Sequence, residues 1–105
     1  MKKGEVVLVP FPFTDLSGDK NRPAVVLVET ELDITVAFIS TKVHQKIDSD
    51  IFLTPNAGNG LKKESILRLS KIATLDKDLI LGRLGEMSEA DLDSVNLRLR
   101  ELFKL

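Results

Sequence analysis

The stretch from residue 6 to residue 28 constrains this chain most, because it contains two apolar, β-branched runs separated by a polar segment. Each run has the length and composition of a buried β-strand. The second run begins at Pro23, which has no N–H to give to a neighbouring strand and therefore suits the first position of a strand. Pro23 also favours an extended backbone at Arg22. The sequence therefore predicts that a long cationic side chain is fixed where a loop ends and a sheet begins.

The middle of the chain predicts further short strands. They are expected over residues 34–39, 51–54, 65–72 and 79–87, with a helical turn over residues 74–78. Within residues 65–72, Leu67 and Leu69 are expected to face inward, with Arg68 and Ser70 on the other face. Residues 55–60, rich in Gly and Asn, predict a turn. Glycines at positions 82 and 85 allow a bend or bulge in the last strand.

The C-terminal residues predict one amphipathic helix. Ser88 is a natural N-cap, and Asp91 follows three residues later in a pair that resembles a capping box. An apolar stripe with helical spacing is expected to pack on the sheet. The stripe consists of Leu92, Val95, Leu99, Leu102 and Phe103. Leu97 lies off the stripe and is expected at the surface or at an interface.

Together these elements predict a single domain spanning residues 1–105, of the all-β or α+β class. Five to seven short, mainly antiparallel strands followed by a C-terminal α-helix indicate a small curled sheet or barrel that is capped by the helix. A chain of 105 residues is long enough for one hydrophobic core.

Composition excludes several kinds of site. The chain has no cysteine and only one histidine, so a disulfide is excluded and a structural zinc site is not expected. We expect no cofactor. No apolar run is long enough to span a membrane, and the N-terminus does not resemble a signal peptide, so a cytoplasmic location is expected. The net charge of −1 permits RNA binding only through a local basic face, such as residues 62–83, where six basic side chains accompany three acidic ones.

Three motifs in chain order resemble the MazF/PemK family of toxins. The first is an apolar strand that leads through a loop into Arg-Pro-Ala-Val-Val-Leu at residues 22–27. The second is the apolar strand of residues 37–41, which ends in Ser-Thr. The third is the strand of residues 65–76, which ends in Thr-Leu-Asp. The similarity covers nearly the whole chain.

The resemblance implies an SH3-like β-barrel with a C-terminal α-helix and a specific activity. Proteins of this family are toxins of type II toxin–antitoxin systems that act as metal-independent endoribonucleases. The implied substrate is single-stranded RNA, in particular mRNA, cleaved with a short sequence preference through attack of a 2′-OH on the scissile phosphate. The implied partners are a second copy of the chain in a homodimer and a cognate antitoxin, with DNA contacted only through the antitoxin.

The resemblance assigns Arg22 and Thr41 as the catalytic pair. A metal-free site of this kind must remove a proton from the 2′-OH, protonate the 5′-oxygen and stabilise the charged phosphorane. Arg22 can bind phosphate oxygens with paired hydrogen bonds. Arginine side chains transfer protons poorly, because their pKa exceeds about 12, and the proton role of Arg22 stays open. Thr41 can donate a hydrogen bond to the phosphate or the attacking hydroxyl. Without the resemblance, the sequence alone favours a structural explanation, in which Arg22 forms a surface ion pair and Thr41 is a threonine at a strand end; the resemblance reverses this preference.

Eight further residues are candidates for RNA contact because they lie in the implied loop over the site, flank Thr41, or share an outward strand face. They are Ser17, Asp19, Lys20, Ser40, Lys42, His44, Arg68 and Ser70. Histidine is the side chain whose ordinary pKa lies near neutrality, so His44 is a candidate general acid or base, or else a solvated loop residue. Phe38 is expected in the core.

Two other functions remain open from the sequence. One is a non-enzymatic poison similar to CcdB, in which the end of the C-terminal helix binds a topoisomerase. The other is an inactive SH3-like binding module. A metal-dependent nuclease is disfavoured, because the candidate ligands Asp15, Asp19, Asp48 and Asp50 are expected in separate loops.

Overall fold

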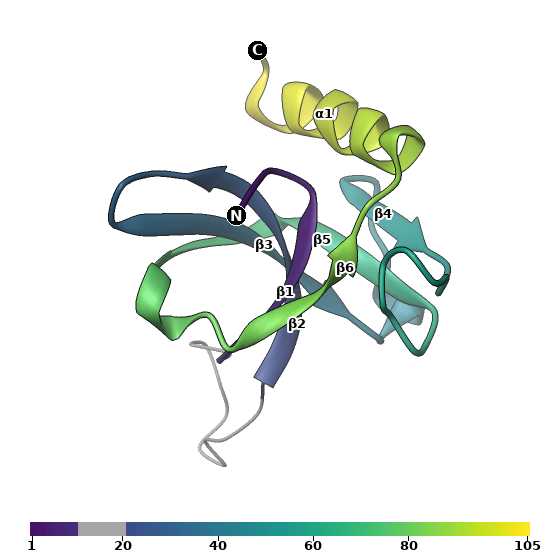
Figure 1. Ribbon diagram of the computed structural model, residues 1–105. Coiled ribbons are helices and arrows are strands. Elements are labelled where there is room, and N and C mark those ends of the chain that lie inside the picture. The colour runs from purple at the N-terminus through teal and green to yellow at the C-terminus, as the bar shows by residue number, and fades with distance from the viewer. Residues whose placement is uncertain (11–20) are drawn as a thin grey trace.

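The structure of the protein is a computed structural model that describes residues 1–10 and 21–105. Three residues predicted to contact RNA, Ser17, Asp19 and Lys20, lie outside the described residues, as do the candidate metal ligands Asp15 and Asp19. Figure 1 shows the elements in chain order. They are β1 (Glu5–Pro10), β2 (Asn21–Glu29), β3 (Asp33–Ser40), the 3₁₀-helix η1 (Val43–Gln45), β4 (Asp50–Leu53), β5 (Ser65–Asp76), the 3₁₀-helix η2 (Lys77–Leu79), β6 (Gly82–Glu86) and α1 (Glu89–Phe103).

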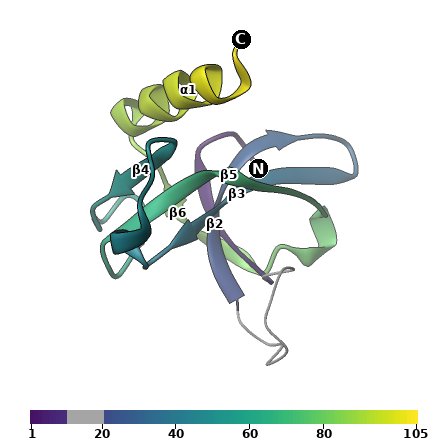
Figure 2. The same ribbon diagram turned by 180° about the vertical axis from the view of Figure 1, so that it is seen from behind.

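The six strands form one antiparallel sheet in the order β4-β5-β3-β2-β1-β6. The sheet curls into a half-barrel, and α1 lies across one side of it (Figures 1 and 2). The predicted fold class, a small antiparallel β-barrel of the SH3-like kind with a C-terminal helix, is confirmed. No helix in the described part of the chain is long and apolar enough to cross a lipid bilayer.

Two apolar clusters lie on opposite faces of the central strands, which explains why these strands read as nearly continuous apolar runs. The helix-side cluster contains Val6, Val25, Leu27, Ala37, Ile39, Ile51, Leu53, Leu67, Leu69, Met87 and Val95. The opposite cluster contains Val7, Val9, Ala24, Val26, Ile34, Val36, Phe38 and Leu75. Phe38 is 4% exposed, so the prediction that it belongs to the core is correct.

An irregularity in β5 changes which side chains face each cluster. Phe38 pairs with Arg68, whereas the preceding residue Ala37 pairs with Ile72, so residues 69–71 have no partner on β3. Leu69 and Ile72 therefore both pack with the helix-side cluster, although strict alternation would place them on opposite faces. Beyond the irregularity, β5 continues to Asp76.

The expected helical turn over residues 74–78 is wrong. Residues 74–76 pair with β3, and the hydroxyl groups of Thr35 and Thr74 lie 2.8 Å apart in a cross-strand hydrogen bond. This tertiary pairing outweighs the local signal, and the helical turn moves to η2. The last strand is also shorter than expected, at Gly82–Glu86.

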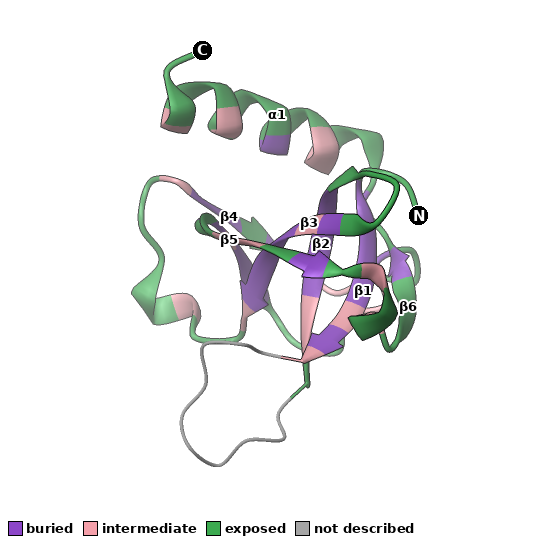
Figure 3. Ribbon diagram, turned by 90° about the vertical axis from the view of Figure 1, so that its left-hand side faces the viewer, coloured by how far each residue is buried: buried purple, intermediate pink, exposed green. Residues whose placement is uncertain are grey.

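The predicted helix is confirmed as α1. The Ser88 hydroxyl accepts a hydrogen bond from the Asp91 amide at 3.1 Å, as expected of an N-cap. Val95 is fully buried, and Leu92, Leu99 and Leu102 pack against the helix-side cluster. Figure 3 shows these less exposed positions on the side of α1 that faces the strands. Leu97, which lies off the stripe, is exposed as expected. The stripe residue Phe103, which is the last residue of the helix, does not pack on the sheet as predicted, because it is 55% exposed.

The segment of residues 54–64 covers the outer edge of β6. The Glu86 amide donates a hydrogen bond to the Gly58 carbonyl at 2.8 Å. Asn59 is 2% exposed, and its side-chain amide donates to the Thr54 carbonyl at 2.9 Å. A β-carbon at Gly85 would lie 2.2 Å from the Gly58 carbonyl oxygen. Glycine is therefore required where this segment meets β6.

This close approach predicts that Gly85→Ala lowers the free energy of unfolding by about 1–3 kcal/mol, because the added methyl group overlaps backbone atoms. The measurement is urea unfolding followed by circular dichroism. Gly82→Ala is the matched control, since a β-carbon there meets no atom within 4 Å. Equal unfolding midpoints for the two variants would contradict the close packing of this segment on β6.

Glu5, the first residue of β1, has a carboxylate that is almost completely covered. It accepts a hydrogen bond from the Lys2 amide at 2.6 Å and another from the Arg83 guanidinium on β6. The Lys2 amide, followed by Arg83, lowers the pKa of Glu5 below its ordinary value of 4.5. The ionised form therefore favours the folded state.

Glu5→Gln should consequently destabilise the protein at neutral pH and have a diminishing effect in acid. The contribution of ionised Glu5 is complete above about pH 4.5 and is lost as the pH falls through the lowered pKa. Thermal melts of the wild type and the variant between pH 7 and pH 2.5 provide the measurement. The difference in Tm between the two proteins at each pH removes the contribution of the other carboxylates, including Glu29, whose pKa is also lowered. A difference that stays constant over this range would contradict the assignment.

Candidate active site

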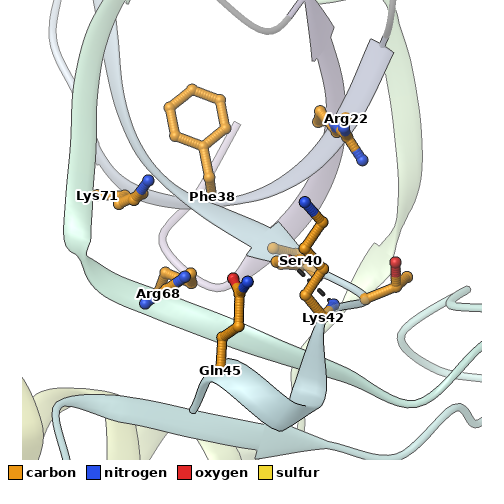
Figure 4. A pocket seen from close by; sticks show the side chains of 9 residues that line it. Arg22, Phe38, Ser40, Lys42, Gln45, Arg68 and Lys71 are labelled. Atoms are coloured by element: carbon orange, nitrogen blue, oxygen red, sulfur yellow. Dashed lines mark hydrogen bonds between the residues drawn. The ribbon is translucent and has the colours of Figure 1, made fainter. Parts of the chain in front are cut away.

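A pocket of about 160 Å³ opens where the start of β2, the end of β3 and the middle of β5 meet (Figure 4). Its described lining consists of Arg22, Phe38, Ile39, Ser40, Thr41, Lys42, Gln45, Arg68 and Lys71. In Figure 4, Arg22 stands on one side, Arg68 and Lys71 on the other, and Lys42 and Gln45 come from the connection after β3.

Arg22 is positioned by the pairing of β1 with β2. It lies opposite Val9, and its neighbour Pro23 lies opposite Leu8. Pairing of β2 with β3 begins only at Ala24. The missing N–H of Pro23 therefore costs no hydrogen bond between β2 and β3. The strand itself begins at Asn21, two residues earlier than the predicted start at Pro23. Arg22 is thus a half-buried residue of the sheet, which restricts where its guanidinium can lie.

The connection after β3 turns tightly and brings several polar groups to the pocket. The Lys42 amide donates to the Ser40 hydroxyl at 3.1 Å, and the Gln45 amide donates to the Lys42 carbonyl at 3.0 Å. Thr41 lies between these bonds, and its carbonyl accepts from the Val43 amide at 2.9 Å. The turn continues into η1, from which Gln45 lines the pocket.

The third wall of the pocket comes from β5, at its irregularity. Arg68 is the last residue paired with β3 before the unpaired residues 69–71, and Lys71 is the last of these. Both line the pocket. Phe38 lies opposite Arg68 on β3 and connects the pocket to the opposite apolar cluster.

The electrostatic character of the pocket favours anions. Four of its described lining residues are cationic and none is acidic. Arginine and lysine near one another in a partly enclosed space bind phosphate groups through charge-assisted hydrogen bonds. Within residues 1–10 and 21–105, no three His, Cys, Asp or Glu side chains come together in a way that could hold a metal ion.

Five of the predicted site residues meet at this pocket. They are Arg22, Ser40, Thr41, Lys42 and Arg68. Two others, His44 and Ser70, are exposed and do not line it. His44 precedes Gln45 in η1 but contributes nothing to the described lining, and Ser70 falls within the irregular part of β5, where alternation with Arg68 is broken.

Sequence reasoning missed two polar lining residues, Gln45 and Lys71. Strict alternation along β5 would place Lys71 on the same face as Leu67 and Leu69, which is the helix side. The position of Gln45 depends on the 3₁₀ turn of η1, which the sequence did not predict. The signal that could have identified Lys71 was its place in the basic stretch of residues 62–83.

Comparison with known proteins identifies the class of this protein. Residues 2–103 match the family described as PemK-like, MazF-like toxins of type II toxin–antitoxin systems, so the chain belongs to this family. The predicted family and the predicted function, an endoribonuclease toxin, are therefore confirmed. Membership of a toxin–antitoxin system also supports the predicted antitoxin partner. No curated protein matches this chain significantly in sequence.

Solved structures show the same fold. The chain is similar to the Mycobacterium tuberculosis toxin MazF-mt6, with 18% sequence identity and a TM-score of 0.79, over 96% of this chain and 97% of that one. It is also similar to an endoribonuclease in complex with its cognate antitoxin from a mycobacterial species, with 17% identity and a TM-score of 0.77, over 100% of this chain and 94% of that one.

Proposed function

We propose that the pocket around Arg22 and Thr41 is the active site at which this toxin cleaves single-stranded RNA without a metal ion. The observation that supports the proposal is the convergence of these two side chains, from β2 and from the end of β3, on one cationic pocket. Of the two alternatives left open by the sequence, neither the CcdB-like poison nor the inactive binding module requires such a pocket. The family match also favours the nuclease.

The proposed chemistry is an internal displacement at phosphorus. The 2′-oxygen forms a bond to phosphorus, the bond to the 5′-oxygen breaks, and the products are a 2′,3′-cyclic phosphate and a 5′-hydroxyl. The proton lost by the 2′-OH is balanced by the proton gained by the 5′-oxygen. Negative charge accumulates on the non-bridging oxygens in the transition state, where fixed donors contribute most to catalysis.

Arg22 is the principal donor in this mechanism. Its half-buried position in the sheet limits the reorganisation needed to bind the phosphorane oxygens. The hydroxyl of Thr41, in the connection after β3, supplies a second donor at the pocket. No described lining residue is a carboxylate or an imidazole, so we assign Arg22 to charge stabilisation and do not assign proton transfer to His44.

The remaining cations suit the flanking phosphates of an extended strand. Lys42, Arg68 and Lys71 are distributed around the pocket at the ends of different elements. RNA bases must be unstacked for the 2′-OH to align with the leaving oxygen, which favours a single strand over a duplex. We further propose that the toxin acts as a homodimer and that its antitoxin inhibits it by blocking access of RNA to this pocket.

Arg22→Ala should reduce RNA cleavage by roughly 10²–10³-fold or more, because it removes the main donor to the transition state. The assay incubates purified protein with a long single-stranded RNA in EDTA and locates the cuts by primer extension. The matched control is Arg98→Ala, because Arg98 lies on α1 and pairs only with the exposed Glu101 among the described contacts. The proposal fails if folded Arg22→Ala protein cuts at the wild-type rate, or if EDTA abolishes cleavage by the wild type.

The role of Thr41 can be tested by two substitutions, one that removes the side-chain hydroxyl and one that keeps it. Thr41→Val keeps the shape of the side chain but removes the hydroxyl donor, and should lower kcat by roughly tenfold. Thr41→Ser keeps the donor and should retain most of the activity. Single-turnover cleavage rates distinguish the two, and equal rates for both variants would exclude a hydrogen-bonding role for Thr41.

A CcdB-like poison predicts a different pattern of toxicity. In that case substitutions at residues 102–105, at the end of α1, would relieve growth inhibition, whereas Arg22→Ala would not. Expression of each variant in a growth assay separates the two functions. The inactive binding module predicts that neither change alters growth.

A further inference from the structure

One cross-strand row of the sheet brings a buried carboxylate to the back of the pocket. Arg68 on β5 lies between Asp50 on β4 and Phe38 on β3, each directly opposite it in the strand pairing. Directly paired residues of neighbouring strands have side chains on the same face. Phe38 and Arg68 line the pocket, whereas Asp50 is not part of its lining.

Asp50 differs from its expected position. The sequence places it in a polar loop, but it is the first residue of β4, and its side chain has no exposed area. Among the described residues it forms an ion pair with Arg68, whose Nε lies 3.5 Å from Asp50 Oδ2 and whose side chain is 16% exposed. A buried carboxylate is costly unless it is paired, so the charge of Asp50 depends on Arg68.

The contact is an ion pair without an aligned hydrogen bond. Both Arg68 Nε and Asp50 Oδ1 are buried without a hydrogen-bond partner. An imperfectly satisfied buried pair contributes little net stability, and two apolar side chains of similar volume would stabilise this position at least as well. A functional explanation is therefore more suitable: the ion pair orients the Arg68 guanidinium, which lines the pocket.

Asp50 also closes a turn in the chain that follows the pocket residue Gln45. Its Oδ2 accepts a hydrogen bond from the Ile47 amide at 2.9 Å, and its own amide donates to the Ile47 carbonyl at 2.9 Å. These two bonds close the turn that follows η1, the element from which Gln45 reaches the pocket. The Asp50 carboxylate therefore contacts both Arg68 and the turn that follows η1.

We propose that Asp50 is a positioning residue, which holds the Arg68 guanidinium against a backbone phosphate next to the scissile one. The inference rests on the proposed function of the pocket. In this arrangement the carboxylate attracts the Nε side of the guanidinium, so that the side chain is ordered before RNA arrives. Pre-ordering of a long cationic side chain reduces the entropy lost on binding.

Neutralising the pair one charge at a time tests this inference. Arg68→Gln should lower Tm strongly, because it leaves the Asp50 carboxylate buried without a cation. Adding Asp50→Asn should restore most of the lost Tm, since no charge then remains buried. The restored protein should still show a KM for RNA raised roughly tenfold or more, with little change in kcat, because the phosphate contact is missing. The substrate is a short single-stranded oligoribonucleotide that contains the cleavage site found by primer extension.

The single substitution Asp50→Asn separates positioning from packing. It keeps a side-chain oxygen for the Ile47 amide and removes only the charge. It should raise KM when Arg68 is present and have no further effect on KM when Arg68 is already glutamine. Equal effects of Asp50→Asn in both backgrounds would overturn the inference, since they would show that Asp50 does not act through Arg68.

The matched control is the other partly buried carboxylate–guanidinium pair, formed by Glu5 and Arg83 away from the pocket. Replacing both by glutamine should leave KM unchanged. A wild-type KM in the protein carrying both Asp50→Asn and Arg68→Gln would overturn the inference. If that protein does not fold, Arg68→Lys replaces it: lysine keeps the charge pair but lacks the forked donor, so KM must rise, and an unchanged KM would overturn the inference.

The result of Arg22→Ala in the same assay distinguishes the two proposals. Wild-type cleavage by Arg22→Ala would show that the proposed active site is wrong. Loss of cleavage by Arg22→Ala, together with unchanged KM across the Asp50 and Arg68 variants, would overturn the positioning role alone.

Discussion

The requirement that the central strands bury apolar side chains on both faces determines where the functional groups can lie. With both faces occupied along most of their length, polar side chains can point away from the core only at strand ends and at irregularities. Arg22 and Thr41 occupy strand ends, and Arg68 and Lys71 border the irregularity of β5. The pocket is therefore located where the continuity of the core is interrupted.

The same constraint explains why much of the fold was predictable. Apolar β-branched runs, a proline near the start of β2 and the Ser88 cap are local signals, and the strands and the helix lie within a few residues of the positions that these signals predicted. Local signals failed where a distant strand decided the outcome. Residues 74–76 resemble a helical turn in isolation, but pairing with β3 gives them a strand conformation that no local pattern encodes.

The site was predictable only to the extent that it follows strand ends. Arg22, Ser40, Thr41 and Lys42 lie at or next to the ends of strands whose limits the sequence indicated within a few residues. Lys71 and Ser70 were misplaced because three unpaired residues in β5 change the alternation, and nothing in the residue types predicts the length of such an irregularity. Asp50 was misplaced for a related reason: a charged residue is expected in a loop unless its cation, eighteen positions further along the chain, is known to lie beside it.

The segment of residues 54–64 has a consequence for association between copies of the chain. An outermost strand with free N–H and C=O groups offers a template on which another chain can add a strand. Beside β6 that template is occupied by the chain itself, through the bond from Glu86 to Gly58 and the close backbone approach at Gly85. This part of the β6 edge is therefore not free to pair with a strand of another chain, and the small size of the glycine at position 85 is what allows the covering segment to approach it.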